Sequence, residues 1–187
     1  MRARFFEWLH RPRMLNNVYF NKDARLAKNT RYSSSVEFVN RNKIKLGDNV
    51  YIGHYVTLDG SAELEIGEGC QISSKVSILT HSSHLSIRLF GKKYNLCKGR
   101  VEDGYILGKV TIGKYTFIGT DSIIAPNVTI GKGCIIGANS FVNRDLEDYA
   151  IAYGSPAKVV GDTRTIDKKF LQNNEKFQDY YNEWNDE

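Results

Sequence analysis

The chain has 187 residues, 41% of them hydrophobic and 25% charged, and its formal net charge is +5 at pH 7. This composition is ordinary for a globular domain, and no apolar run approaches the roughly 20 residues of a membrane helix. The basic residues are scattered without a nucleic-acid motif, so we expect neither a nucleic-acid partner nor an integral membrane segment. Charged residues interrupt the apolar N-terminus, so we expect no signal peptide and a cytoplasmic protein.

The first 35 residues lack the spacing that dominates the rest of the chain, and we expect them to form a cap. From Leu46 onward an aliphatic residue recurs every six positions, with one shift of two residues and one long interruption. The positions are Leu46, Ile52, Leu58, Ile66, Ile72, Ile78, Ile112, Ile118, Ile124, Ile130, Ile136 and Val142. A six-residue period is typical of a parallel β-helix, whereas antiparallel sheets show irregular spacing. We therefore predict an all-β fold, with the β-helix over residues 36–160.

The six-residue unit has a simple geometry: one short strand and one turn, with three units closing a coil of about eighteen residues. Each repeated aliphatic should point inward, and so should the residue two positions earlier, which we expect to be small because it lies near a corner. The turns Gly47-Asp48-Asn49, Gly67-Glu68-Gly69 and Gly131-Lys132-Gly133 suit left-handed backbone angles. The three cysteines show no paired spacing, which argues against a disulfide framework or a zinc site.

The interruption, residues 80–108, should form a protruding loop, because insertions in repeat proteins extend from one face and often carry function. It opens with His81 and His84, directly after a predicted strand. A histidine at a strand end suits a general base, although a loop histidine taken alone is more often without such a role. Asp59, in Thr57-Leu58-Asp59-Gly60, either orients a base or an acceptor or is simply a turn residue.

The chain ends in a segment with a different pattern. The repeat closes near Gly154-Ser155-Pro156-Ala157-Lys158. Beyond it, Phe170, Phe177, Tyr181 and Trp184 are spaced at roughly helical intervals. We predict one amphipathic C-terminal helix in residues 161–187, packed on the coils or on a partner.

Roughly residues 36–160 resemble hexapeptide-repeat acyltransferases, and two segments carry the likeness. The segment Ile66-Gly67-Glu68-Gly69-Cys70-Gln71-Ile72 through Ser77-Ile78-Leu79-Thr80-His81 is similar to the family's active-site coil. The later hexads and the closing Gly154-Ser155-Pro156-Ala157-Lys158 are similar to its acetyl-CoA half. The likeness is greatest to sugar and polysaccharide O-acetyltransferases, such as the maltose and galactoside acetyltransferases. It implies a left-handed parallel β-helix assembled as a homotrimer, with acetyl-CoA between subunits.

The resemblance also implies roles for individual residues. His81 matches the catalytic base, with Asp59 as its candidate partner, and His84 and His54 are candidates for binding the acceptor. The acetyl-CoA donor would contact Phe117, Gly119, Ala125, Gly137, Ala138 and Lys158. Two departures put the acceptor in doubt more than the donor: Tyr51-Ile52-Gly53-His54 lacks the family's acceptor-binding Asn, and Phe117 replaces a frequent Trp.

The expected activity is acetyl transfer from acetyl-CoA to a hydroxyl of a sugar or polysaccharide, with no metal required. N-acetylation of an amino sugar or a nucleotide sugar is the alternative within enzymes. A zinc carbonic anhydrase would need three converging histidines, and the later coils contain none. A non-catalytic binding solenoid would need neither the histidine at the loop opening nor the Pro-Ala-Lys end.

Overall fold

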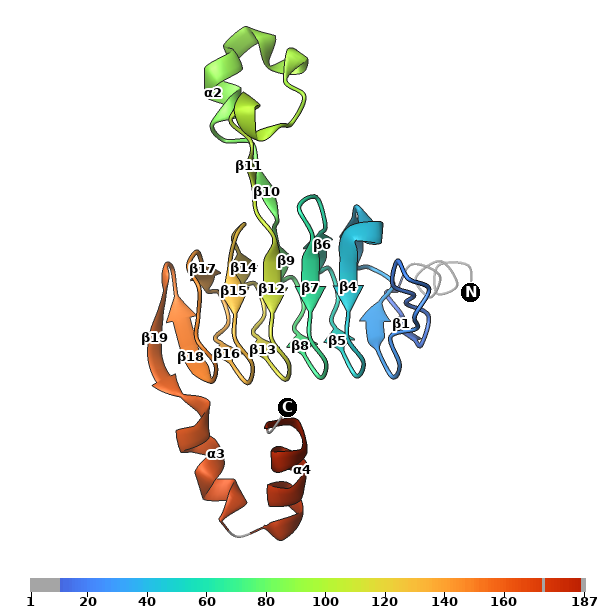
Figure 1. The fold of residues 1–187 in the computed structure, drawn as a ribbon, viewed down its shortest axis with the longest axis vertical. Helices are drawn as coiled ribbons and strands as arrows, with labels where there is room; N and C mark the ends of the chain where they lie inside the picture. Colours follow the sequence, from blue (N-terminus) through green and yellow to red (C-terminus); the bar gives the residue numbers. More distant parts are fainter. Residues whose placement is uncertain (1–10, 173, 186–187) are drawn as a thin grey trace, which may run out of the picture.

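The computed structural model describes residues 11–172 and 174–185, and three parallel sheets form its body (Figure 1). Sheet 1 has the order β1 (Met14–Asn16), β2 (Arg31–Ser33), β5 (Tyr51–Ile52), β8 (Gln71–Ile72), β13 (Phe117–Ile118), β16 (Ile135–Ile136), β18 (Ala150–Gly154) and β19 (Ala157–Asp162). Only its two ends, β1 on β2 and β18 on β19, pair antiparallel. The chain visits sheets 1, 2 and 3 in turn, which is the arrangement of a parallel β-helix.

The other two sheets complete the coils. Sheet 2 has the order β17 (Phe141–Val142), β14 (Ile123–Ile124), β9 (Ser77–Ile78), β6 (Thr57–Asp59) and β3 (Glu37–Val39). Sheet 3 has the order β15 (Thr129–Ile130), β12 (Val110–Ile112), β7 (Leu64–Ile66) and β4 (Ile44–Leu46). A short 3₁₀ helix, η1 (Arg41–Lys43), leads into β4.

The repeated aliphatics form ladders through the interior. In sheet 1, Ile52 pairs with Ile72, Ile72 with Ile118 and Ile118 with Ile136, and all four are fully buried. The residues two positions earlier also point inward. They are small in sheets 1 and 2, but in sheet 3 buried Ile44 and Leu64 take this position. In the later coils of sheet 3, buried Val110 and Val128 follow the expectation, so it fails only at Ile44 and Leu64.

The first coil begins earlier than residue 36, because Tyr32 in β2 already pairs with Ile52. Residues 11–30 cover its open end. The Asn21 side chain accepts a hydrogen bond from the Leu46 N–H group (2.9 Å) and donates one to the Leu46 carbonyl (3.1 Å). It thereby satisfies both backbone groups of an edge strand, and the buried Tyr19 hydroxyl donates to the Ile44 carbonyl. The first ten residues of the expected cap lie outside the described residues.

The C-terminal segment is two helices, α3 (Thr163–Leu171) and α4 (Glu175–Asn185), so the prediction of one helix was wrong. Asp162 caps α3 by accepting from the Arg164 N–H group, and Asn174 accepts from that of Phe177 at the start of α4. The second cap marks the start of a separate helix. The hairpin turns α4 back under the solenoid (Figure 1), where the rings of Trp184 and Tyr115 lie 4.7 Å apart.

The insertion leaves the solenoid after Thr80 and returns at Gly108, whose N–H group donates to the Thr80 carbonyl. Two short antiparallel strands, β10 (His81–Ser82) and β11 (Ile106–Leu107), form a stalk. Residues 83–105, which we call the arm, contain α2 (Ser86–Phe90), η2 (Gly91–Leu96) and η3 (Val101–Asp103). The arm projects from the solenoid on the side away from α3 and α4 (Figure 1). In residues 11–172 and 174–185, no helix has the length and apolarity needed to cross a membrane.

Candidate active site

Asp59 ends β6 at the corner between sheets 2 and 3, and it is 1% exposed. Its Oδ1 accepts a hydrogen bond from the Ser61 N–H group at 2.9 Å. Its Oδ2 accepts two from Thr80, from the N–H group at 2.8 Å and from the hydroxyl at 2.9 Å. Thr80 lies on the next coil, where the chain leaves the solenoid. The buried carboxylate therefore fixes the point at which the stalk begins.

His81 completes this corner. Its Nδ1 lies 2.6 Å from Oδ2 of Asp59. The His81 side chain is 39% exposed, against 2% for that of Asp59, so the imidazole faces solvent while the carboxylate does not. An ionised carboxylate only accepts hydrogen bonds, so Nδ1 carries the proton and Nε2 of the neutral ring has a free lone pair. This is the tautomer that a general base needs.

The hydrogen bonds around Asp59 keep it ionised. Burial alone would raise the pKa of Asp59, but hydrogen bonds from Ser61, His81 and Thr80 outweigh burial and hold the pKa below its usual range. A negative charge thus remains next to the imidazole at neutral pH. It can stabilise the imidazolium that forms when Nε2 accepts a proton.

Tyr105, at the base of the arm, is a neighbour that the sequence analysis missed. Its ring lies parallel to the His81 imidazole, with 6.3 Å between centroids and 8° between planes. Its hydroxyl is 3.0 Å from that of Tyr94. The insertion lacks the six-residue period, so the sequence does not indicate where Tyr94 and Tyr105 lie relative to the coils. The two ends of the insertion pair as a hairpin, with Ser82 opposite Ile106, and the position of Tyr105 depends on this pairing rather than on the six-residue period.

The other two candidate histidines each contact a serine hydroxyl rather than a carboxylate. His84 is exposed at the start of the arm, with Nδ1 2.8 Å from the Ser82 hydroxyl. His54 lies in the turn between β5 and β6, with Nδ1 2.7 Å from the Ser33 hydroxyl. This turn is the corner between sheets 1 and 2, at the other end of the sheet 2 strands from Asp59. Within one chain, the structure therefore does not bring His54 to His81.

Five of the six candidate donor residues lie along one edge. Gly119, Gly137 and Ala138 occupy successive turns between sheets 1 and 2, and Phe117 is two residues before the first of them. Lys158 follows in the β18–β19 hairpin, opposite Tyr153. We call these five residues the donor edge. Ala125 instead follows β14, at the corner between sheets 2 and 3 that His81 shares.

The glycines of this edge have a structural reason to be glycine. A Cβ atom on Gly119 would lie 2.5 Å from the backbone nitrogen of Ala138, and one on Gly137 would lie 2.7 Å from the Cβ of Tyr153. Neither glycine has a positive φ angle. Close stacking of the coils is therefore sufficient to require glycine at both positions, and a left-handed backbone is not the reason. The turns 47–49, 67–69 and 131–133, for which left-handed backbone was predicted, each have a positive φ angle at their third residue. These residues are Asn49, Gly69 and Gly133.

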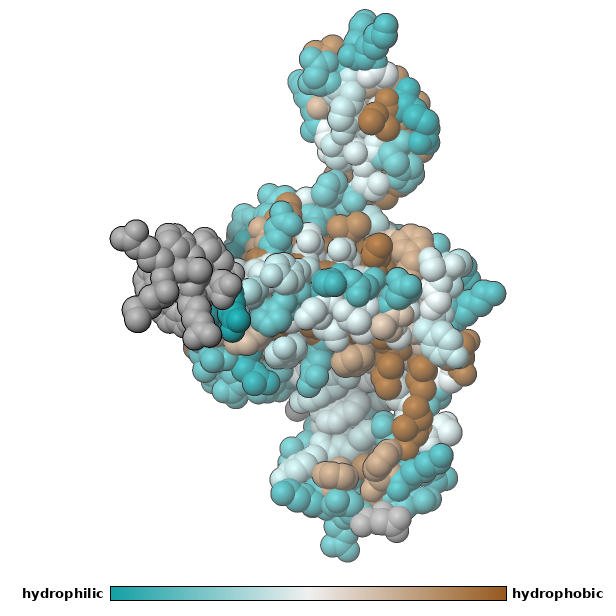
Figure 2. All heavy atoms as spheres, turned by 180° about the vertical axis from the view of Figure 1, so that it is seen from behind, coloured by the Kyte–Doolittle hydropathy of each residue, from teal (hydrophilic) through white to brown (hydrophobic). Residues whose placement is uncertain are grey.

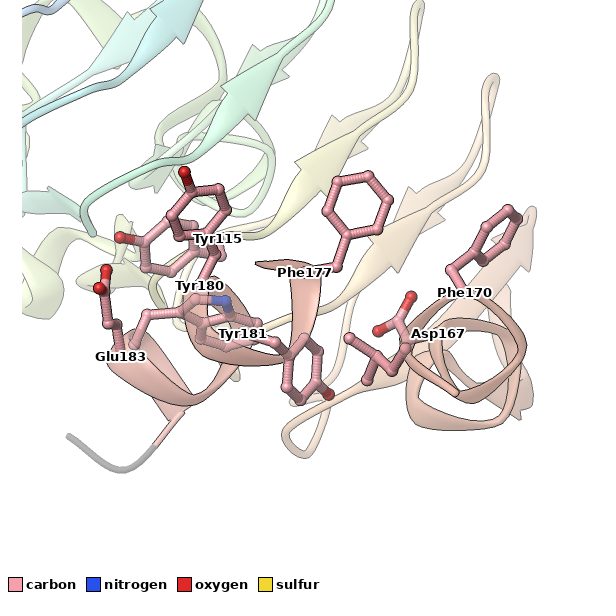
Figure 3. Close-up of a pocket in the computed structure, with 9 residues that line it drawn as sticks. Tyr115, Asp167, Phe170, Phe177, Tyr180, Tyr181 and Glu183 are labelled. Carbon is pink, nitrogen blue, oxygen red and sulfur yellow. The ribbon is translucent and has the colours of Figure 1, made fainter. Parts of the chain in front are cut away.

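A separate hollow lies between α3, α4 and the solenoid, with a cavity volume of about 520 Å³ (Figure 3). Its lining is mainly aromatic, with two acids: Tyr115, Asp167, Phe170, Leu171, Phe177, Tyr180, Tyr181, Glu183 and Trp184. Burial, followed by the nearby charge of Asp162, raises the pKa of Asp167. None of the candidate site residues lines this hollow. Among residues 11–172 and 174–185, no group of three or more His, Cys, Asp or Glu side chains is placed to hold a metal ion.

The six-residue period and three-walled body define a hexapeptide-repeat protein, and the comparisons agree. Residues 109–144 match the family model described as bacterial transferase hexapeptide (six repeats). An Escherichia coli dTDP-4-amino-4,6-dideoxy-D-glucose acyltransferase is 30% identical over 132 residues, which are 69% of this chain and 64% of that protein. The galactoside O-acetyltransferase of E. coli strain K12 is 28% identical, over 84% of this chain and 70% of that protein. The chain thus spans about two thirds of the length of these relatives.

A solved structure with the same fold is that of AntD, an N-acyltransferase from Bacillus cereus, in complex with dTDP and 3-hydroxybutyryl-CoA. It superposes with a TM-score of 0.61 at 25% identity, over 85% of this chain and 98% of AntD. Residues 109–144 therefore carry the repeat of the bacterial transferase hexapeptide family, and the chain around them is similar to sugar acyltransferases of that family. Its relatives are named acyltransferases of sugars, and acyl-CoA is bound in the solved neighbour.

Proposed function

We propose that this protein transfers an acetyl group from acetyl-CoA to a hydroxyl of a sugar or polysaccharide, with His81 as the general base. The observation that carries the proposal is the 2.6 Å contact between Nδ1 of exposed His81 and the buried Asp59 carboxylate. Because Nδ1 carries the proton in this contact, Nε2 is the basic atom of His81, at the start of the stalk. The names of the relatives support the class of substrates.

The proposed reaction is a direct transfer. Nε2 of His81 accepts the proton of the acceptor hydroxyl as its oxygen attacks the thioester carbonyl carbon. The carbon–sulfur bond breaks, the acetyl group stays on the acceptor, and the imidazolium returns its proton to the departing thiolate of CoA. Asp59 remains ionised and stabilises the imidazolium. General base catalysis of this kind typically contributes about 10²–10⁴-fold to the rate.

We propose further that the site is completed by a second copy of the chain, in a homotrimer of left-handed β-helices. In one chain, His81 and the donor edge lie at different corners of the coil, and packing of two copies would bring such corners together. Exposed apolar residues in β19 and α3, including Val159, Val160 and Phe170, support self-association. Figure 2 shows hydrophobic residues gathered on one side of the molecule, where the solenoid meets the C-terminal segment. Sedimentation that gives a fully active monomer would exclude this assembly.

The direct test is thiol release from acetyl-CoA with a panel of methyl glycosides as acceptors. We expect release that depends on the glycoside and a product heavier by one acetyl group. His81→Ala should lower turnover by at least about 10²-fold without unfolding the protein. His84→Ala is the matched control and should retain most of the activity. Loss of activity in His84→Ala alone would mean that His84, not His81, is the base.

A second candidate is N-acylation of a nucleotide-linked amino sugar. The observation in its favour is the likeness to the dTDP-amino-sugar acyltransferase and to AntD. The two reactions differ in the acceptor atom, so the same panel separates them when it includes dTDP-4-amino-4,6-dideoxyglucose. A kcat/KM for the amino sugar at least about 100-fold above that of every methyl glycoside would replace O-acetylation with N-acylation.

A further inference from the structure

The base of the arm holds an aromatic ring against the imidazole of the candidate base. The rings of Tyr105 and His81 are 6.3 Å apart and within 8° of parallel, which is an offset stacked pair. Tyr105 precedes β11, and the register of the stalk places Leu107 opposite His81. The stalk, which is fixed by backbone pairing, therefore sets where this ring lies.

The Tyr105 ring is anchored at its far end as well. Its hydroxyl lies 3.0 Å from that of Tyr94, which belongs to η2 in the arm. This hydrogen bond is the largest cause that raises the pKa of Tyr105, so the phenol is neutral at physiological pH. The ring is thus held by the stalk on one side and by the body of the arm on the other.

Asp59 alone does not fix the orientation of the imidazole. A single hydrogen bond to Nδ1 sets a distance, but it leaves the ring free to tilt about that bond, and Nε2 moves with the tilt. A parallel ring alongside removes this freedom. We propose that Tyr105 is a positioning residue for His81, which holds the imidazole plane so that Nε2 faces the acceptor. The inference rests on the proposed role of His81 as the base, and Tyr105 acts through His81.

Three variants separate the ring from the hydroxyl. Tyr105→Leu removes the ring but keeps an apolar side chain, and we expect kcat to fall about 2- to 10-fold with an unchanged KM for acetyl-CoA. Tyr105→Phe keeps the ring and should restore kcat to within about twofold of the wild type. Tyr94→Phe removes the hydrogen bond that anchors the Tyr105 hydroxyl. Its kcat should lie between those of Tyr105→Leu and Tyr105→Phe. The assay uses acetyl-CoA with the methyl glycoside of highest rate.

A spectroscopic measurement tests the geometry without turnover. A stacked ring shifts the carbon-bound protons of the His81 imidazole through its ring current, and these resonances are assigned by their absence in His81→Gln. We expect the shift in the wild type and in Tyr105→Phe, and its loss in Tyr105→Leu. Unchanged resonances in Tyr105→Leu, or an unchanged kcat, would overturn the proposal. Full activity of His81→Gln would instead overturn the proposed role of His81 as the base. The ring-current shift in the wild type would still report whether the two rings stack, so the two failures can be told apart.

Discussion

Oδ2 of Asp59 accepts hydrogen bonds from both the N–H group and the hydroxyl of Thr80, the last residue before His81. The same oxygen also contacts Nδ1 of His81. One buried carboxylate therefore anchors the exit of the chain from the solenoid and holds Nδ1 of the candidate base. These two tasks can be separated by substitution, because Thr80 contributes to the first and His81 to the second.

Asp59→Asn should lower kcat by at least about 10²-fold. The amide keeps the size of the side chain, but it removes the charge that stabilises the imidazolium, and its NH₂ group cannot accept a hydrogen bond as the replaced carboxylate oxygen does. Thr80→Val is the matched control, since it removes one hydrogen bond to Asp59 and keeps the backbone bond. Steady-state rates should show a much smaller effect of Thr80→Val. Equal losses in both variants would indicate that Asp59 acts only as an anchor.

The contribution of Asp59 to stability should depend on pH. Because its pKa is lower in the folded protein than in the unfolded chain, the ionised carboxylate stabilises the fold above the unfolded value of about 4. This stabilisation is lost as pH falls through the folded pKa. Denaturant unfolding should therefore show the wild type more stable than Asp59→Asn at pH 7, with the difference shrinking towards pH 3. A difference that grows on acidification would contradict the direction of the shift.

Lys158 is exposed, and its proposed partner is a phosphate of CoA. Lys158→Glu should weaken the binding of acetyl-CoA about tenfold at low salt, since the proposed attraction becomes a repulsion. Titration calorimetry against acetyl-CoA and its 3′-dephospho form should show a larger effect on the first. Raised salt should reduce the difference, because exposed charges are screened over about 8–10 Å. Lys169→Glu, at an exposed position in α3, is the matched control. Equal affinities for acetyl-CoA before and after the Lys158 substitution would show that Lys158 does not bind the donor.

The period of the sequence predicted the ladders well because each inward aliphatic stacks on its equivalent in the next coil. It failed at the first coil, where Tyr32 and Phe38 take the inward positions. No full coil lies beneath them, so they pack with Tyr19 of the cap, with ring centroids 5.3–6.2 Å apart. Aromatic residues at these positions hid the period, and the predicted boundary came too late.

The pairing of Asp59 with His81 could be predicted from the sequence, because residues about twenty positions apart lie at the same corner of successive coils. Asp59 and His81 are separated by 22 positions, and both were candidates. Their roles in catalysis stay predictions. Tyr105 was out of reach, since its position depends on how the insertion pairs with itself rather than on the repeat. The start of α4 carries a cap at Asn174, and a helical spacing of aromatics does not reveal such a cap.

Gly119→Ala tests whether coil stacking is the reason for the glycine. The added Cβ atom would lie 2.5 Å from the backbone nitrogen of Ala138 and 2.8 Å from its Cα atom, so two coils must move apart. We expect a loss of about 1–3 kcal/mol in the free energy of unfolding, as for overpacking in a core. Gly161→Ala is the matched control: its Cβ atom would meet the Ile151 side chain at 3.4 Å, an ordinary contact, and the change should stay within about 0.5 kcal/mol. Denaturant unfolding measures both. If Gly119→Ala were as stable as the wild type but bound acetyl-CoA poorly, then space for the donor, rather than stacking, would be the reason for the glycine.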